Sequence, residues 1–265
     1  MCDCQPKRPP TRRELLIGAA TAAPAIALAG LLGPGRSTPV SAAVAAVEVM
    51  PGLSILPRDA WGADLPPKGA IGREDPKFLL VHHTASPNDY ASARSLIRTT
   101  YEWHTSNDPT KGWPDVAYEF FVGRDGDVWE GRSGALAGPV QASATGGSQG
   151  WGQLVCLLGD FTSVQPTAAA QTSLVKVLAW LADRYQIDTA PGATVSFVSR
   201  GSQRWPTGSA VTSTTIAPHR DMSYTSCPGD AFAPLVPGLA TRVQAQRAAW
   251  SSVIKPAVRL GPATP

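Results

Sequence analysis

The feature that most constrains the fold is a set of three metal-binding side chains from distant parts of the chain. The segment Phe78–His83 is a continuous apolar run that ends in the pair His82-His83. His219 and Cys227 lie eight residues apart in a later segment rich in Pro, Ser and Thr. Two imidazoles and one thiolate form a zinc-type donor set, and three protein ligands leave a fourth position open, as in catalytic zinc sites. The fold must therefore bring the end of an early strand against a late loop.

The histidine pair supplies one ligand rather than two. Successive side chains of a strand point to opposite faces, so His83 is expected to face away from the site that His82 faces. A buried, hydrogen-bonded histidine pair is the alternative interpretation. In the later segment, the Pro228-Gly229 turn would fix the direction of the Cys227 thiolate, and the alternative is a thiol beside an unrelated histidine.

Residues 1–45 have the pattern of a twin-arginine signal peptide. Thr11-Arg12-Arg13-Glu14-Leu15-Leu16 opens it, and a run rich in Ala and Leu follows to about Gly33. Ala43-Val44-Ala45 is a small-x-small cleavage candidate, with Ser41-Ala42-Ala43 as a second choice. An uncleaved membrane anchor is the alternative. The pattern predicts export to the periplasm, the cell wall or the medium, without stable membrane insertion after cleavage.

The charge of the chain resides in this leader. Five basic and two acidic side chains give residues 1–45 a net charge of +3, which equals that of the whole chain. The remainder is close to neutral and offers no basic stripe for phosphates, so we expect no nucleic-acid partner.

Residues 46–258 are long enough for one domain, and residues 259–265 are expected to be a loose tail. Strands alternating with helices imply a layered α/β fold. The predicted strands cover 78–83 and 153–161, with a hairpin over 116–129. The predicted helices cover 91–105 and 166–185, and a helical stretch over 229–254 is broken by prolines. Residues 46–60 are expected to be an irregular lead-in, 131–152 a surface loop and 190–215 irregular.

Two cysteines remain once the leader, with Cys2 and Cys4, is removed. In an exported protein Cys156 and Cys227 could pair as a disulfide. Cys156 lies in an apolar segment where a thiol acts as a small filler, and Cys227 has the better claim on a metal.

An ordered set of motifs resembles the type-2 N-acetylmuramoyl-L-alanine amidases, zinc enzymes related to the animal peptidoglycan recognition proteins. The resemblance covers about residues 55–235 and implies a single domain with a central mixed β-sheet flanked by helices on both faces. The motifs are Arg58-Asp59-Ala60-Trp61-Gly62-Ala63, Val81-His82-His83-Thr84, Trp113 to Val122, Asp125 to Arg132, Leu158-Gly159-Asp160-Phe161, Pro166-Thr167, and His219-Arg220-Asp221 with Thr225-Ser226-Cys227-Pro228-Gly229.

The resemblance implies roles for single residues. His82, His219 and Cys227 match the zinc ligands. Tyr118 matches a tyrosine whose hydroxyl contacts the attacking water or the substrate carbonyl, and Thr225 lies where relatives carry a residue near the developing oxyanion. The implied substrate is peptidoglycan, cut between N-acetylmuramic acid and L-alanine. The alternatives are a core aromatic for Tyr118 and a turn cap for Thr225.

Four further residues are candidates for substrate binding: His83, His104, Trp129 and Arg132. For His104, an interaction with the helix dipole is the alternative; for Trp129 it is core packing, and for Arg132 a surface salt bridge. Glu119 should point away from Tyr118 on its strand, which argues against it as the general base.

A peptidoglycan-binding module without catalysis is the second functional hypothesis. Relatives of that kind typically lack the cysteine ligand, whereas this chain keeps Cys227. An unrelated zinc peptidase is disfavoured because the sequence has no His-Glu-x-x-His motif. Ser133-Gly134-Ala135 stands where relatives often carry Gly-Trp or Asn-Phe, so a stem peptide with diaminopimelate and one with lysine are both compatible with the sequence.

Overall fold

The computed structural model describes residues 44–253. The expected signal peptide therefore lies almost wholly outside the described residues, as does the expected tail over 259–265. Within the described part, no helix combines the length and the apolar character needed to cross a membrane.

A five-stranded mixed sheet forms the centre of the domain. Its strand order is β5 (Val128–Glu130), β4 (Phe120–Val122), β6 (Gly152–Leu157), β3 (Phe78–His83) and β9 (Ile216–Pro218). β3 runs parallel to both β6 and β9, β4 is parallel to β6, and β5 closes one edge antiparallel to β4. Every residue of β3 and β6 is buried, as expected of parallel strands covered on both faces.

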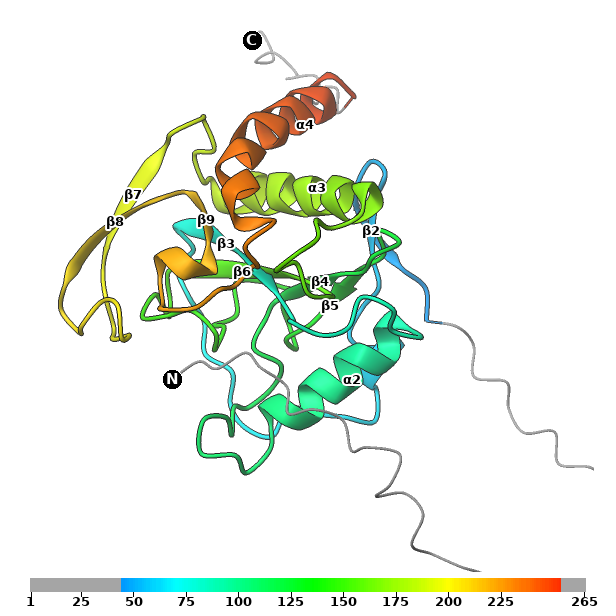
Figure 1. Cartoon of the computed structure of the whole chain (residues 1–265). Coiled ribbons are helices and arrows are strands. Elements are labelled where there is room, and N and C mark those ends of the chain that lie inside the picture. The colour runs from blue at the N-terminus through cyan, green and yellow to red at the C-terminus, as the bar shows by residue number, and fades with distance from the viewer. Residues whose placement is uncertain (1–43, 254–265) are drawn as a thin grey trace, which may run out of the picture. The chain divides into compact units, whose positions relative to one another are not determined.

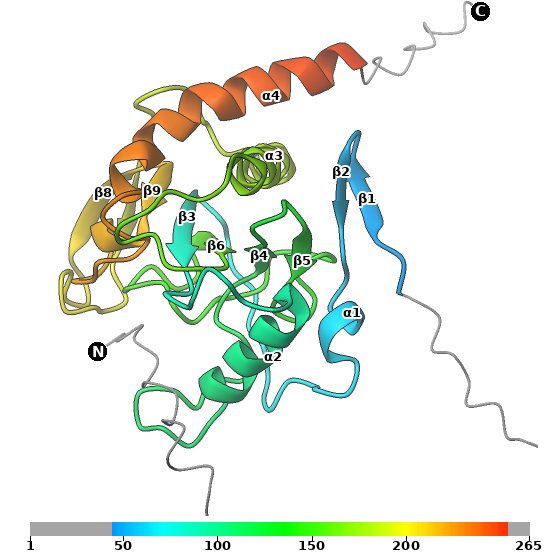
Figure 2. The ribbon, with the colours of Figure 1, turned by 45° about the vertical axis from the view of Figure 1, so that its right-hand side comes forward.

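Helices cover the two faces of this sheet (Figures 1 and 2). α3 (Ala168–Tyr185) and α4 (Leu239–Val253) lie on one face, and α1 (Asp59–Gly62) and α2 (Ala93–His104) on the other. Alternate residues of β3 join different cores: Leu79 and Val81 pack with α3, whereas Phe78 and Leu80 pack with α2. The predicted α/β class, with helices on both faces of a mixed sheet, is confirmed.

Helices α2 and α3 each begin two residues later than predicted, after a residue whose side chain caps the helix. The Ser92 hydroxyl accepts a hydrogen bond from the Ser95 amide at the start of α2, and the Thr167 hydroxyl accepts one from the Ala170 amide at the start of α3. Such caps satisfy amides that have no partner within the helix. The C-terminal stretch is broken as predicted, with a 3-10 segment η2 (Ala233–Gly238) before α4.

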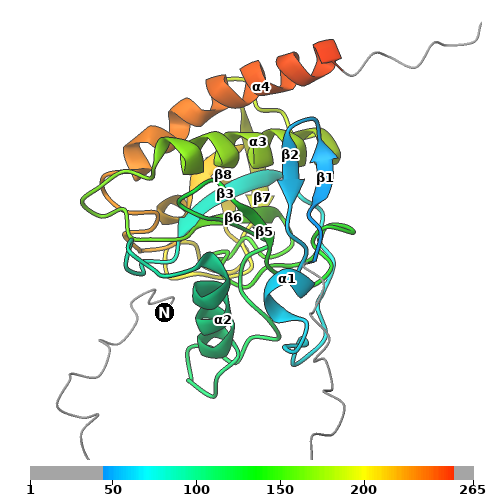
Figure 3. The ribbon, with the colours of Figure 1, turned by 90° about the vertical axis from the view of Figure 1, so that its right-hand side faces the viewer.

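The lead-in over 46–60 is more regular than predicted. It forms a hairpin of β1 (Val47–Met50) and β2 (Leu53–Ile55), followed by α1 (Figure 3). After β2 the chain continues beside β5, where the Leu56 amide donates to the Val128 carbonyl at 2.8 Å. The Trp250 indole of α4 donates to the Pro51 carbonyl at the hairpin turn, so this lead-in is part of the domain.

Two other expectations for loops are wrong. Residues 190–215 contain an antiparallel hairpin of β7 (Thr194–Val198) and β8 (Ala210–Thr214). Residues 131–152 have no regular secondary structure outside β6, as predicted, but they do not form a surface loop. Small side chains such as Ala135, Ala142 and Ala144 are buried against the two cores, because their size lets an irregular backbone pack closely.

Candidate metal centre

The fold brings together the three ligands expected from the sequence. β3 carries His82, and the neighbouring parallel strand β9 runs into the 3-10 turn η1 (His219–Asp221), which carries His219. Cys227 follows on the loop after η1. One ligand atom from each of the three side chains lies within 4.8 Å of the others, and all three side chains are buried.

The geometry fits a zinc ion. The Cys227 sulfur and His82 Nδ1 are 3.6 Å apart. Zinc–sulfur and zinc–nitrogen bonds of about 2.3 and 2.1 Å at a tetrahedral angle place the two atoms about 3.6 Å apart. Both ring nitrogens of His219 are buried with no hydrogen-bond partner among the described residues. Buried polar atoms normally have partners, so these unpaired nitrogens point to a missing ligand.

Burial also favours the protonation state that a metal ligand needs. It lowers the pKa of His82 well below the usual value, and the neighbouring His219 lowers it further. It lowers the pKa of His219 to about 3. Both imidazoles are therefore neutral at physiological pH and can donate a lone pair.

Backbone and side-chain contacts fold the loop between His219 and Cys227 back on itself. The Arg220 amide donates to the Cys227 carbonyl at 3.1 Å, and the Arg220 guanidinium donates to the carbonyls of Ser226 and Cys227. Gly229 adopts a φ of +99°, and a Cβ there would lie 2.2 Å from the Phe161 carbonyl carbon. Only glycine allows the chain after Cys227 to pass this close to the segment after β6.

Tyr118 lies beside the metal ligands. It is buried, its ring centroid is 5.1 Å from that of His82, and its side chain forms a hydrogen bond with the Cys156 thiol. Cys156 on β6 is the register partner of His82 on β3. Cys156 and Cys227 do not form a disulfide, which leaves the Cys227 sulfur for a metal.

Glu119, which immediately precedes β4, points away from this site, as expected from the sequence. Its Oε2 accepts a hydrogen bond from the Leu154 amide at 2.8 Å. Burial and the nearby Glu74 carboxyl raise the pKa of Glu119 well above its usual value. A carboxyl held by the Leu154 amide is not placed to act as a base at the metal centre.

Thr225 caps the turn that carries Cys227. Its Oγ1 accepts a hydrogen bond from the Cys227 amide at 3.2 Å, which is the structural role considered for it from the sequence. A hydroxyl that accepts one hydrogen bond still has its own proton to donate.

His83 and His104 are both enclosed. His83 faces the opposite side of the sheet from His82, as predicted, and its Nδ1 accepts from the Phe161 amide at 3.3 Å. His104 ends α2, and its Nδ1 accepts from the Ala117 amide at 3.0 Å. Its ring packs against Tyr118 with centroids 5.5 Å apart. In this structure the two histidines support neighbouring segments and do not line an open groove.

Arg132 and Trp129 also lie apart from the metal ligands. The Arg132 side chain is 2% exposed and donates to the carbonyls of Val116 and Gln141 and to the Ser143 hydroxyl. It organises the interior instead of forming the surface salt bridge or groove wall considered above. Trp129 is half-buried and lines a different hollow, beside the start of α2.

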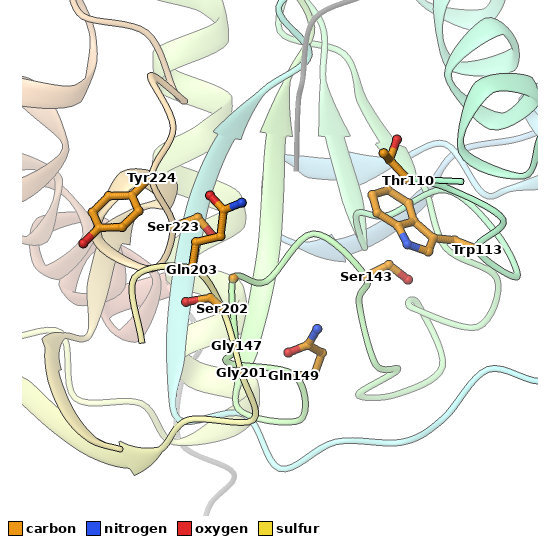
Figure 4. A pocket seen from close by; sticks show the side chains of 11 residues that line it. Thr110, Trp113, Ser143, Gly147, Gln149, Gly201, Ser202, Gln203, Ser223 and Tyr224 are labelled. Atoms are coloured by element: carbon orange, nitrogen blue, oxygen red, sulfur yellow. The ribbon is translucent and has the colours of Figure 1, made fainter. Parts of the chain in front are cut away.

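A pocket of about 240 Å³ adjoins the loop that carries the metal ligands. Trp113 and Ser143 lie on one side of it, with Ser202, Gln203 and Ser223 on the other (Figure 4). Glycine backbone and small polar groups make up most of its lining. No sequence pattern indicated this pocket, because much of its wall comes from residues 131–152 and from the connection between β7 and β8, which show no periodicity.

Comparison with known proteins identifies relatives. The family model described as N-acetylmuramoyl-L-alanine amidase matches residues 72–230. The Homo sapiens protein of that name is 31% identical over 190 residues, covering 68% of this chain and 27% of the human protein. Peptidoglycan-recognition protein SC2 of Drosophila melanogaster is 25% identical over 182 residues, covering 67% of this chain and 82% of that protein. The chain spans about a quarter of the length of the human relative and of the Sus scrofa protein of the same name.

Solved structures share the fold. The Drosophila peptidoglycan recognition protein SD aligns with a TM-score of 0.51 at 20% identity, covering 69% of this chain and 92% of that one. The ectodomain complex of peptidoglycan recognition proteins LCa and LCx, solved with tracheal cytotoxin, gives 0.52 at 20% identity, covering 69% and 93%.

Proposed function

Because this chain belongs to the N-acetylmuramoyl-L-alanine amidase family, we propose that it is an exported zinc-dependent amidase of peptidoglycan. The bond cleaved is the amide between N-acetylmuramic acid and L-alanine. The observation that carries the proposal is the convergence of His82, His219 and Cys227 within 4.8 Å. Their two imidazoles are neutral and include buried nitrogens without partners among the described residues.

The chemistry requires help at both reactants, since an amide is a poor electrophile and water a poor nucleophile. A zinc ion bound to His82, His219 and Cys227 supplies Lewis acidity toward the carbonyl and lowers the pKa of water. The thiolate offsets one of the two positive charges of the ion, so the site keeps a net charge of +1 for this role.

In the proposed mechanism, two hydroxyls stabilise the charge that develops on the carbonyl oxygen. Tyr118 lies against His82, and Thr225 lies two residues before Cys227. A preorganised hydrogen-bond donor aimed at a developing oxyanion commonly contributes about 10²–10³ in rate. We assign Tyr118 and Thr225 as the catalytic donors.

The substrate assignment rests on the family and on the pocket beside the loop from His219 to Cys227, which we call the ligand loop. Several relatives carry names that refer to peptidoglycan. The polar, glycine-rich walls of the pocket, together with the Trp113 ring, suit a glycopeptide that combines amides, hydroxyls and apolar sugar faces. Export is supported by the twin-arginine pattern at Arg12-Arg13, and sequencing the N-terminus of the secreted protein would test it.

Digestion of purified peptidoglycan tests the activity directly. Mass spectrometry should detect free stem peptides and an intact glycan, and a chelator should abolish their release until zinc is restored. A folded, zinc-loaded protein that leaves the polymer unchanged would refute the amidase assignment.

The peptidoglycan recognition proteins among the relatives support a second candidate function, which is binding of peptidoglycan without cleavage. The two functions differ in their need for the thiolate. If the protein is an amidase, Cys227→Ser should abolish hydrolysis. If it is a recognition module, the parent should show no hydrolysis, and Cys227→Ser should bind peptidoglycan in a sedimentation assay as well as the parent does.

A further inference from the structure

The segment that joins β7 to β8, residues 199–209, rests against the residues that follow His219; we call it the hairpin tip. Three of its side chains donate to three successive carbonyls. Ser202 Oγ donates to the Met222 carbonyl at 3.0 Å, and the Trp205 indole donates to the Asp221 carbonyl at 2.9 Å. The Arg204 guanidinium donates to the Arg220 carbonyl.

These carbonyls need donors from elsewhere. η1 has only three residues, and a helix this short leaves the carbonyls at its end without partners inside the helix. The His219 carbonyl accepts from the amides of Met222 and Ser223. The next three carbonyls along the chain receive their side-chain donors from the hairpin tip.

The hairpin tip is itself held in one conformation. The Ser202 amide donates to the Trp205 carbonyl at 2.8 Å, and the Trp205 amide donates to Ser202 Oγ at 2.9 Å. Ser199 Oγ also donates to the Trp205 carbonyl, and the Arg200 amide donates to the Gly147 carbonyl at 2.7 Å. The backbone that carries Ser202 and Trp205 is therefore held by contacts that do not involve the ligand loop.

The same contacts reach the second ligand of the loop. Arg220, whose carbonyl the hairpin tip holds, donates through its amide and its guanidinium to the Cys227 carbonyl. A displacement of the backbone at residues 220–222 would thus move His219 and Cys227 together.

We propose that Ser202, Arg204 and Trp205 are positioning residues that hold His219 and Cys227 in their metal-binding arrangement. The inference rests on the zinc site of the proposed function, but not on the reaction catalysed there. Without these donors the ligand loop gains conformations that the ion must suppress on binding, so metal affinity falls. Loss of groups that orient metal ligands typically weakens binding by about 10–100-fold.

The test measures zinc affinity of the full chain by competition with a chromogenic chelator, with no substrate present. Ser202→Ala and Trp205→Phe each remove one donor and keep most of the packing, and we expect each to weaken zinc binding roughly tenfold and the double variant more. Ser196→Ala is the matched control. The Ser196 hydroxyl belongs to the same hairpin and lies 2.9 Å from the Thr212 hydroxyl, away from the ligand loop. Its removal should leave zinc affinity unchanged.

A second readout separates positioning from folding. The unfolding temperature of the metal-free single variants should stay near that of the parent. Hydrolysis by Trp205→Phe, whose side chain does not line the pocket beside the ligand loop, should return at saturating zinc. Zinc affinity within twofold of the parent in both single variants would overturn the proposal. The proposal would also be overturned if the metal-free variants unfolded at a temperature low enough to account for the loss of zinc affinity, and if excess zinc did not restore hydrolysis by Trp205→Phe. A zinc-affinity loss in a protein that cuts no peptidoglycan would sustain this inference and reject the amidase.

Discussion

Glu74→Gln should stabilise the folded protein above neutral pH and have little effect near pH 5. Glu74 lies just before β3, where its Oε1 accepts from Gln153 Nε2 at 2.5 Å and its Oε2 accepts from the Gly150 amide at 3.2 Å. Burial raises the pKa of this carboxyl to about 8, against 4.5 for the free side chain. The nearby Glu119 carboxyl is also buried, so ionisation of Glu74 places a charge in a poorly solvated cluster.

The sign follows from proton binding in the two states. Between about pH 4.5 and 8 the folded protein keeps the Glu74 proton and the unfolded chain releases it. The free energy of unfolding therefore falls as pH rises through this window, by up to about 1.4 kcal/mol per pH unit. Over pH 5–8 the loss is on the order of 2–4 kcal/mol. Glutamine carries no such proton, so its burial has no pH dependence in this window.

Thermal unfolding at pH 5 and pH 8 measures this difference. We expect the variant and the parent to unfold at similar temperatures at pH 5, and the variant to unfold several degrees higher at pH 8, since 1 kcal/mol corresponds to about 2–4 °C in a domain of this size. Glu102→Gln, at an exposed position of α2, should give no pH-dependent gain. A Glu74→Gln protein whose advantage is the same at both pH values would refute the reasoning.

Four other changes probe the metal site and the core. Cys227→Ser should lower zinc affinity by about two orders of magnitude or more, whereas Cys156→Ser should retain zinc, as elemental analysis after dialysis would show. Tyr118→Phe should keep the metal and lower kcat by about 10²–10³; an unchanged kcat would remove Tyr118 from the mechanism. Removal of zinc by a chelator should lower the unfolding temperature, with recovery on re-addition, because the ion binds the folded state. Asp115→Ala removes the buried partner of Arg58, which lies 3.0 Å away, and should cost about 3–5 kcal/mol in denaturant unfolding.

The sequence predicted the part of the fold that places His82. An unbroken apolar run such as 78–83 fits a strand covered on both faces, and β3 has that environment. Alternation along the strand also separated His82 from His83 correctly, because side-chain direction in a strand depends on the backbone alone. The donor types of His82, His219 and Cys227 indicated that they converge on a metal, and the family resemblance supported that inference, since spacing along the chain alone does not fix contacts between distant segments.

The hairpin tip and its strands were missed for a physical reason. β7 and β8 bury few side chains, chiefly Phe197 and Val211, and the remaining positions are mostly Ser, Thr and other exposed residues. The alternation of apolar and polar residues is confined to Thr194–Phe197 in β7, a run too short to stand out as the main strand signal in a sequence. Their pairing is instead supported by backbone hydrogen bonds and by the contacts of the hairpin tip with the ligand loop.

The buried location of residues 131–152 was hidden by the same lack of periodicity. Buried side chains bond to the backbone of this segment: Arg132, which lies within it, donates to the Gln141 carbonyl, and Asp115 accepts from the Ser133 amide. An irregular segment can be buried when its backbone groups have such hydrogen-bond partners. The local sequence pattern does not indicate these partners.

The order in which the ligands occur along the chain has a consequence during synthesis. A ribosome delivers His82 long before His219, and β9 can join β3 only once nearly the whole domain has been translated. A nascent or prematurely terminated polypeptide that stops before residue 219 holds a single ligand and cannot assemble the three-ligand metal centre. The topology thus delays the formation of this centre until the last stage of biogenesis.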